Sequence, residues 1–146
     1  MVKPFKFSLE NVLQYRSDVE EEKKTMYQDA RQNLQIARDQ YQDILSEIED
    51  LNKMLRRNTG LSIQTLQQCY QYKNQLEARL TLQRIELEQK EIDMLTAQNQ
   101  LIAAKQDVHV LEKLKEKKRE VYDIELRRQE NKQLDEFSTM SFASKG

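Results

Sequence analysis

The sequence is poor in the residues that reverse a chain, since its 146 residues include only two Gly and one Pro. Sheets, doubly wound folds and phosphate-binding loops need tight turns, which are built largely from Gly, Pro and short polar residues. The chain also lacks Trp and has a single cysteine, Cys69, so it cannot form an internal disulfide. These absences exclude most globular architectures and leave a few very long helices.

Charge of one sign and long apolar runs are absent as well. The net charge of −1 gives no global electrostatic support for binding nucleic acid. No apolar run approaches the roughly 18 residues that would span a bilayer, and residues 1–6 contain no hydrophobic signal core. We therefore expect a cytoplasmic protein that does not bind nucleic acid.

What the sequence does contain is apolar residues at alternating steps of four and three, the pattern of a coiled-coil seam. In the first half the seam residues are Ala30, Leu34, Ala37, Tyr41, Ile44, Ile48, Leu51 and Leu55. In the second half they are Leu66, Cys69, Leu76, Leu80, Leu87, Met94, Ala97, Leu101, Ala104, Val108 and Leu111, interrupted by Lys73, Gln83 and Lys90. The pattern predicts two helices that bury these stripes against each other.

Upstream of Ala30 the seam is weaker. The residues expected to hold the frame there are Leu9, Val12, Val19 and Met26, with Arg16 and Lys23 at two further seam positions. The step from Met26 to Ala30 to Leu34 is four plus four, which predicts a stutter that locally unwinds the supercoil.

The boundaries follow from capping and turn residues. Ser8 and Ser62 are expected N-caps, which gives a first helix over about 8–57, a turn over about 58–61, a second helix over about 62–136 and a flexible tail over 137–146. Because only about four residues link the helices, they must fold back antiparallel. We predict an all-α single domain over 1–146, a coiled-coil hairpin whose second helix overhangs, without an intramolecular partner, after about Lys113.

Nothing in the pattern supports catalysis or ligand binding. Two paired helices form no concavity that excludes water, His109 is the only histidine, and no His, Cys, Asp and Glu set has metal-ligand spacing. We expect a non-enzymatic protein without a metal, a cofactor or a small-molecule ligand.

Two features exceed what a hairpin needs. A second apolar stripe on the second helix points away from the seam and consists of Leu82, Ile85, Ile92, Leu95, Ala103 and Val110. It indicates a surface for a partner or for self-association, unless these are scattered exposed residues. The overhang carries a basic run over 111–119, which indicates docking to another protein or a merely solvated helix end.

Three segments resemble the FliJ family, the small coiled-coil component of the flagellar type III export apparatus. They are the aromatic start from Phe5 to Arg16, the segment from Gly60 through Leu66 to Leu76, and the ending from Leu111 through Tyr122 to Lys132-Gln-Leu-Asp-Glu136. The resemblance implies a stalk-like coiled coil that lies at the flagellar base, in the cytoplasm and peripheral to the inner membrane through its partners. These partners are the hexameric export ATPase, whose assembly and activity it promotes, the cytoplasmic domain of the export gate, and the export chaperones.

The resemblance also implies two sets of contact residues. The ATPase-binding set lies at the end that bears both termini and comprises Leu9, Val12, Leu13, Arg16, Leu114, Lys115, Lys118 and Tyr122. The export-gate-binding set comprises Tyr41, Tyr72 and Leu76.

Other classes of function stay open at this point. A generic structural coiled coil could self-associate through the second apolar stripe. A chaperone resembling prefoldin would need exposed apolar tips, and residues 56–62 offer little such surface. An RNA-binding arm has only the local basic run in its favour.

Overall fold

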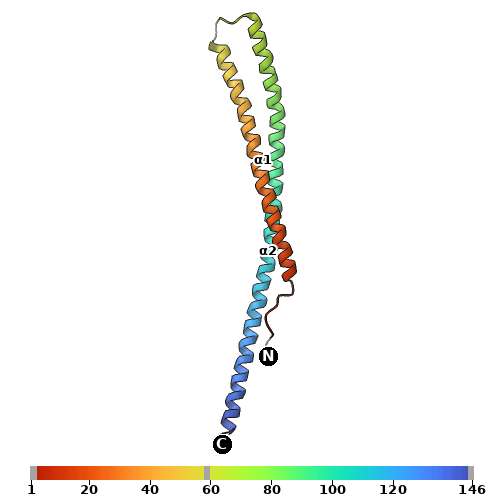
Figure 1. The fold of residues 1–146 in the computed structure, drawn as a ribbon, viewed down its shortest axis with the longest axis vertical. Helices are drawn as coiled ribbons and strands as arrows, with labels where there is room; N and C mark the ends of the chain where they lie inside the picture. Colours follow the sequence, from red (N-terminus) through yellow and green to blue (C-terminus); the bar gives the residue numbers. More distant parts are fainter. Residues whose placement is uncertain (1–2, 58–59, 145–146) are drawn as a thin grey trace. The chain divides into compact units, whose positions relative to one another are not determined.

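The computed structural model describes residues 3–57 and 60–144, and it consists of two long helices (Figure 1). Helix α1 covers Glu10–Arg57 and helix α2 covers Ile63–Ser144. No strand occurs in the part of the chain that the structure describes. The predicted all-α helical hairpin is confirmed.

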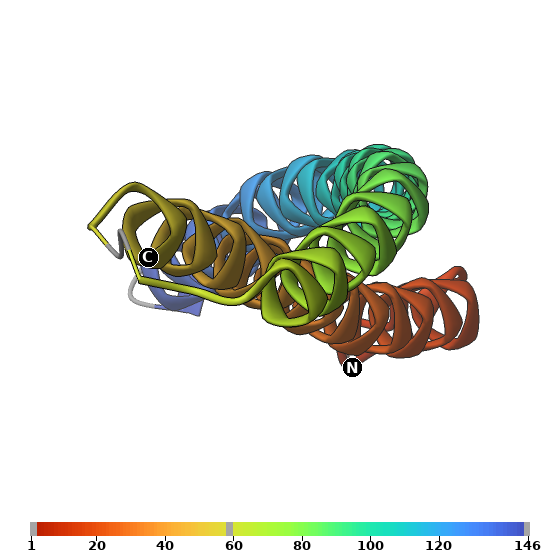
Figure 2. The same cartoon turned by 90° about the horizontal axis from the view of Figure 1, so that it is seen from above.

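Contacts between the helices show that they run antiparallel. The hydroxyl of Tyr72 in α2 donates to Glu47 Oε2 of α1 at 3.2 Å. Farther along α2, Gln83 Nε2 donates to the carbonyl oxygen of Ala37 at 3.2 Å. The partner's number in α1 falls as the number in α2 rises, as the antiparallel arrangement requires. Viewed from above, Figure 2 shows the end of α1 and the start of α2 side by side.

The two helix starts differ from each other. At α2 the predicted cap is confirmed, because Ser62 Oγ accepts from the backbone N–H of Thr65 at 3.2 Å. At α1 the expected start at Ser8 is wrong: the carbonyl oxygen of Leu9 accepts the first helical bond, from the N–H of Leu13 at 2.8 Å. Residues 58–59 of the predicted turn lie outside the described residues.

The far end of α2 also differs from the expectation. The helix continues to Ser144, so the predicted flexible tail over 137–146 is wrong for residues 137–144. Residues 137–144 contain no Gly or Pro to stop a helix, and Thr139 Oγ1 donates to the carbonyl oxygen of Asp135 one turn earlier, at 2.9 Å. Residues 145–146 lie outside the described part.

Contacts divide the chain into two compact units, to which both helices contribute. The terminal unit comprises Met1–Glu21 and Ala103–Gly146, and the turn-proximal unit comprises Glu22–Ile102. That residues 1–146 form a single domain stays a prediction.

The predicted seam is confirmed in its main part. In the turn-proximal unit, Leu34 is 3% exposed, Ala37 is 2% exposed and Leu76 is fully buried. In the terminal unit, Ala104 and Val108 are each 6% exposed. The remaining predicted seam residues from Ala30 to Leu111 are buried or half-buried, including Lys73, Gln83 and Lys90 at its polar positions. Burying a Leu in such a seam contributes about 1.5–3 kcal/mol.

The predicted stutter is wrong. Of the residues expected in the seam upstream of Ala30, Leu9, Val19 and Lys23 are half-buried, whereas Arg16 is exposed and Val12 and Met26 are 43% and 44% exposed. Leu13 is buried, while Glu20 and Tyr27 are half-buried, and these three residues precede Leu34 at steps of seven. The seven-residue frame therefore continues through this part of α1, because the methylene and ring portions of polar side chains fill seam positions.

Candidate protein-interaction surfaces

The terminal unit contains a segment without helix or strand, the N-terminal arm (residues 3–9), that contacts α2. Pro4 lacks a backbone N–H and disfavours helix in the residue before it. The hydroxyl of Tyr122 donates to the carbonyl oxygen of Lys3 at 2.6 Å. The rings of Phe5 and Tyr122 lie with their centroids 5.6 Å apart and tilted by 55°, a favourable aromatic geometry. The arm is thus attached to α2 through its backbone, at Lys3, and through a side chain, at Phe5.

A guanidinium completes this contact. Cζ of Arg119 lies 5.0 Å from the centroid of the Phe5 ring and 5.6 Å from that of Tyr122, within cation–π range of both. Arg119 Nε also lies 3.5 Å from Asp123 Oδ1, one turn farther along α2. We refer to Phe5, Arg119 and Tyr122 as the arm latch.

The latch changes where the unpartnered part of α2 begins. The expectation that residues after Lys113 have no intramolecular partner is wrong as far as Tyr122. One reason is register: Glu10 Oε2 meets Lys115 Nζ at 2.8 Å, whereas Leu9 was expected beside 108–111. The second reason is the arm, which extends the pairing beyond the start of α1.

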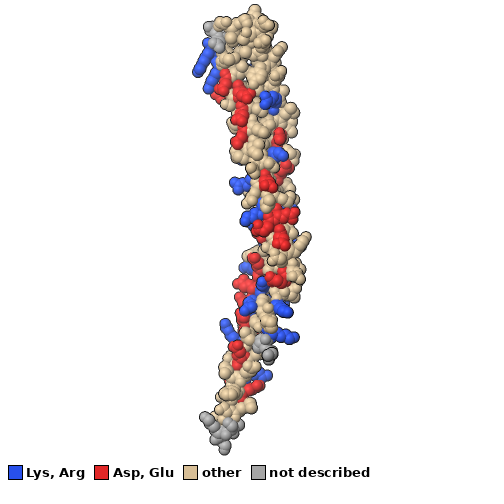
Figure 3. Space-filling model, in the orientation of Figure 1, with Lys and Arg blue, Asp and Glu red and all other residues tan. Residues whose placement is uncertain are grey.

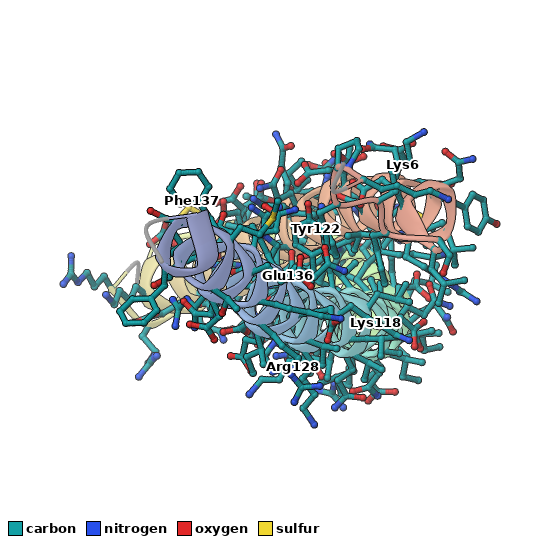
Figure 4. The ribbon with its side chains drawn as sticks, turned by 90° about the horizontal axis from the view of Figure 1, so that it is seen from below. Lys6, Lys118, Tyr122, Arg128, Glu136 and Phe137 are labelled. Carbon is teal, nitrogen blue, oxygen red and sulfur yellow. The ribbon has the colours of Figure 1, made fainter. Side chains whose placement is uncertain are left out.

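Beyond the latch, α2 is largely exposed. Leu126 is half-buried there, whereas five other large apolar side chains are 60–84% exposed: Ile124, Leu134, Phe137, Met140 and Phe142. Figure 4, viewed from below, shows Phe137 projecting from the side of α2 and Tyr122 farther back on the same helix.

All eight residues of the predicted ATPase-binding set lie in the terminal unit. Val12, Arg16 and Lys118 are exposed there, whereas Leu13 is 9% exposed and packs inside the unit. The half-buried members of the set are Leu9, Leu114, Lys115 and Tyr122. Arg16 is also paired across the helices, with its Nη1 3.5 Å from Asp107 Oδ2. The exposed members are those available to a partner.

The predicted gate-binding residues lie in the turn-proximal unit. Tyr72 is 45% exposed and its hydroxyl is held by Glu47. Tyr41 is half-buried, and Leu76 is fully buried in the seam. Only Tyr72 thus presents a largely accessible side chain at this site.

The surface that carries these residues has mixed charge. Figure 3 shows Lys and Arg side chains interspersed with Asp and Glu over the visible face. Within residues 3–57 and 60–144, no group of three or more His, Cys, Asp or Glu side chains is arranged to hold a metal ion. Neither helix, over the same residues, has a segment both long and apolar enough to cross a membrane.

A family model described as "Flagellar FliJ protein" matches residues 5–146, nearly the whole chain. The chain belongs to the FliJ family. Membership identifies it as a protein related to flagellar export, of a family whose members are non-catalytic export components. No curated protein and no solved structure matches the chain significantly.

Within this FliJ family protein, sequence reasoning missed the arm latch. The family resemblance gives Tyr122 as a partner contact, and it does not predict the hydrogen bond of Tyr122 to Lys3 or its ring contact with Phe5. The available signal was the pair of aromatic residues Phe5 and Phe7 beside Pro4, a start too apolar to be left in solvent.

Proposed function

We propose that this protein is a non-enzymatic, stalk-like component of the flagellar export apparatus, located in the cytoplasm at the flagellar base. Its terminal unit binds the centre of the hexameric export ATPase and promotes its assembly and activity. Its turn-proximal unit contacts the cytoplasmic domain of the export gate, and the protein also engages export chaperones. Association with the inner membrane is peripheral and occurs through these partners.

The observation that carries the proposal is the terminal unit's surface. It combines the exposed side chains of Val12, Arg16 and Lys118 with a paired end that the arm latch fixes. A surface that is already ordered loses less conformational entropy when it binds than a frayed helix end does. The exposed apolar side chains of α2 beyond the latch, such as Phe137 and Phe142, add apolar area to this surface.

A central subunit of this kind acts through its lack of symmetry. Six identical ATPase subunits around two helices and an arm would meet different side chains, so each would experience a different contact free energy. Such differential binding shifts the populations of subunit conformations, which favours ring formation and sequential nucleotide turnover. The chain supplies no catalytic group in this mechanism.

The gate contact is proposed for the exposed face around Tyr72. Its hydroxyl is fixed on Glu47, so the ring has a defined orientation, and a ring with a polar tip suits an interface. Leu76 and Tyr41 support this face by packing, since Leu76 is inaccessible to a partner and Tyr41 is half-buried.

ATP turnover of the purified export ATPase, with and without this protein, tests the function. We expect the protein to raise both turnover and the fraction of hexamer, and the variant Arg16→Glu/Lys118→Glu to lose most of this effect. The matched control is Arg38→Glu/Arg79→Glu, which makes the same charge change at exposed positions of the turn-proximal unit. An ATPase that responds to neither the protein nor its variants would refute the proposal, and equal loss in both variants would refute the assignment to the terminal unit.

A further inference from the structure

The outer face of α2 in the turn-proximal unit carries an apolar stripe that residues 3–57 and 60–144 leave largely exposed. Its members are 51–68% exposed, and they are Leu82, Ile85, Ile92 and Leu95. On the same helix segment, the seam residues Gln83, Leu87, Lys90 and Met94 are all half-buried against α1. Over these turns α2 therefore carries apolar side chains on two sides, Leu87 and Met94 in the seam and the stripe on the other side, although a two-helix hairpin needs only one such side.

The spacing of the stripe defines the shape of its occupant. Leu82 to Leu95 spans 13 residues, or about 20 Å at 1.5 Å per residue. At about 100° per residue the four side chains fall on one face of α2, opposite the seam. A helix of about four turns with its own apolar face matches this length and this face.

The charges around the stripe decide which helix fits. Four exposed carboxylates border or interrupt it, from Glu86, Glu88, Glu91 and Asp93, against the single exposed cation Arg84. The other cation of the segment, Lys90, lies in the seam frame and is half-buried. A helix with Lys and Arg beside its apolar face would complement this border, whereas acidic flanks would be repelled.

The same charges disfavour a second copy as the occupant. Two copies joined through this stripe would bring four carboxylates of one chain near four of the other, with one Arg from each to offset them. Like charges across a helical interface are destabilising.

We propose that the stripe Leu82, Ile85, Ile92 and Leu95 is a docking surface for an amphipathic helix of another protein, with basic residues bordering its apolar face. The surface is separate from the residues assigned to the ATPase and the export gate, so this inference does not depend on the proposed function. Apolar burial supplies most of the affinity, and the carboxylates select the partner's charge.

The test uses the full chain and synthetic 18-residue helical peptides. One peptide carries Leu at both seam positions of each heptad and Lys or Arg at the bordering positions, the second carries Glu at those borders, and the third is a scramble of the first. Fluorescence anisotropy at low salt is expected to show the basic-bordered peptide binding at least about tenfold more tightly than either other peptide. This preference should shrink as salt screens the carboxylates.

Two variants distinguish the stripe from a general affinity for basic peptides. Ile85→Asp/Ile92→Asp should weaken binding at least about tenfold, whereas the matched control Val121→Asp/Ile124→Asp, equally exposed in the terminal unit, should bind like the parent. Because all four positions are 57–65% exposed, helix content and unfolding midpoint should change little. Glu86→Lys/Glu91→Lys should shift the preference toward the acidic-bordered peptide.

The proposal is overturned if the stripe variant binds the basic-bordered peptide as the parent does, or if charge reversal leaves the preference unchanged. Sedimentation equilibrium of the unliganded protein provides the other decisive outcome. If the parent protein is a dimer and the variant Ile85→Asp/Ile92→Asp is a monomer, the occupant of the stripe is a second copy of this chain. That result would contradict the proposal that the occupant is a basic helix of another protein. A monomer in both cases agrees with the proposal.

Discussion

The turn-proximal and terminal units hold the same two helices together by different means. In the turn-proximal unit a mainly apolar seam is closed around the fully buried Leu76, and the polar residues within it, Lys73, Gln83 and Lys90, are half-buried. In the terminal unit the pairing is extended past the seam by an arm without regular structure, through one backbone carbonyl, two rings and a guanidinium. Stability that rests on apolar burial is insensitive to salt, whereas stability from exposed polar contacts is smaller and more easily displaced. The pairing that the arm adds to the terminal unit is therefore more sensitive to salt than the seam of the turn-proximal unit.

The largest effect is expected from the centre of the turn-proximal seam. Leu76→Ala should lower the free energy of unfolding by about 2–5 kcal/mol, because it leaves a cavity at a fully buried position. Urea denaturation followed by circular dichroism measures this. The control Leu82→Ala removes the same atoms from a side chain that is 68% exposed and should stay within about 0.5 kcal/mol of the parent. Equal losses in both variants would contradict the assigned seam.

A smaller and more local effect is expected from Leu13→Ala in the terminal unit. Leu13 is 9% exposed, and its loss should open this unit without unfolding the other one. Hydrogen exchange should show protection reduced by about 2 kcal/mol in residues 10–21 and 103–115, with little change in 63–80. Val12→Ala, at a position 43% exposed, is the control. Exchange that accelerates uniformly along both helices would show that the units do not open separately.

The arm latch should contribute less than either seam. Tyr122→Phe keeps the ring but removes the hydrogen bond to Lys3, which weakens arm docking by about 0.5–1.5 kcal/mol. Trypsin cleavage after the exposed Lys6 reports the undocked fraction, and we expect it to accelerate about 2- to 12-fold. Tyr15→Phe, which alters a ring that is 62% exposed, should leave the rate unchanged. An unaltered rate in Tyr122→Phe would mean that the hydroxyl does not hold the arm.

The smallest effects are expected from the surface ion pairs, and they still separate the units. Glu10→Gln removes the partner of Lys115 at 2.8 Å and should cost up to about 1 kcal/mol, because this pair joins the two helices. Glu49→Gln removes a pair within α1 at 3.3 Å and should cost less than about 0.5 kcal/mol. Denaturation midpoints at low and high salt measure both. A larger cost for Glu49→Gln would contradict this ranking.

Much of the fold could be predicted from the sequence because the residues that pair the two helices recur at heptad spacing. The seam from Ala30 to Leu111 follows from heptad spacing, and burial confirms it even at Lys90, a position that looks polar in the sequence. The second stripe was predicted in the same way, and Ile85 and Ile92 are exposed as expected.

The errors in the predicted seam arise because the apolarity of a residue alone does not determine whether it lies in the seam. Met26 and Val12 were preferred over Tyr27 and Leu13, although continuation of the frame from Leu34 selects the latter pair. The end of α2 lies later than predicted because residues 137–144 contain no Gly or Pro, so nothing in them breaks a helix.

The arm latch could not be derived from periodicity. Its partners are 114 residues or more apart in the chain, and their contact depends on the path of an irregular segment and on the register of the hairpin. The assignments of residues to the ATPase and the gate depend on family resemblance, and the structure adds which of those side chains are accessible: Val12, Arg16, Lys118 and Tyr72.

The central claim is that the terminal unit, rather than the turn-proximal unit, contacts the export ATPase. Site-specific photo-crosslinking from position 118 and, separately, from position 79 to the purified export ATPase hexamer tests it most directly, since Lys118 and Arg79 are both exposed cations on α2 in different units. The account predicts an adduct with the ATPase from position 118 and none from position 79. An adduct from position 79 alone would contradict it.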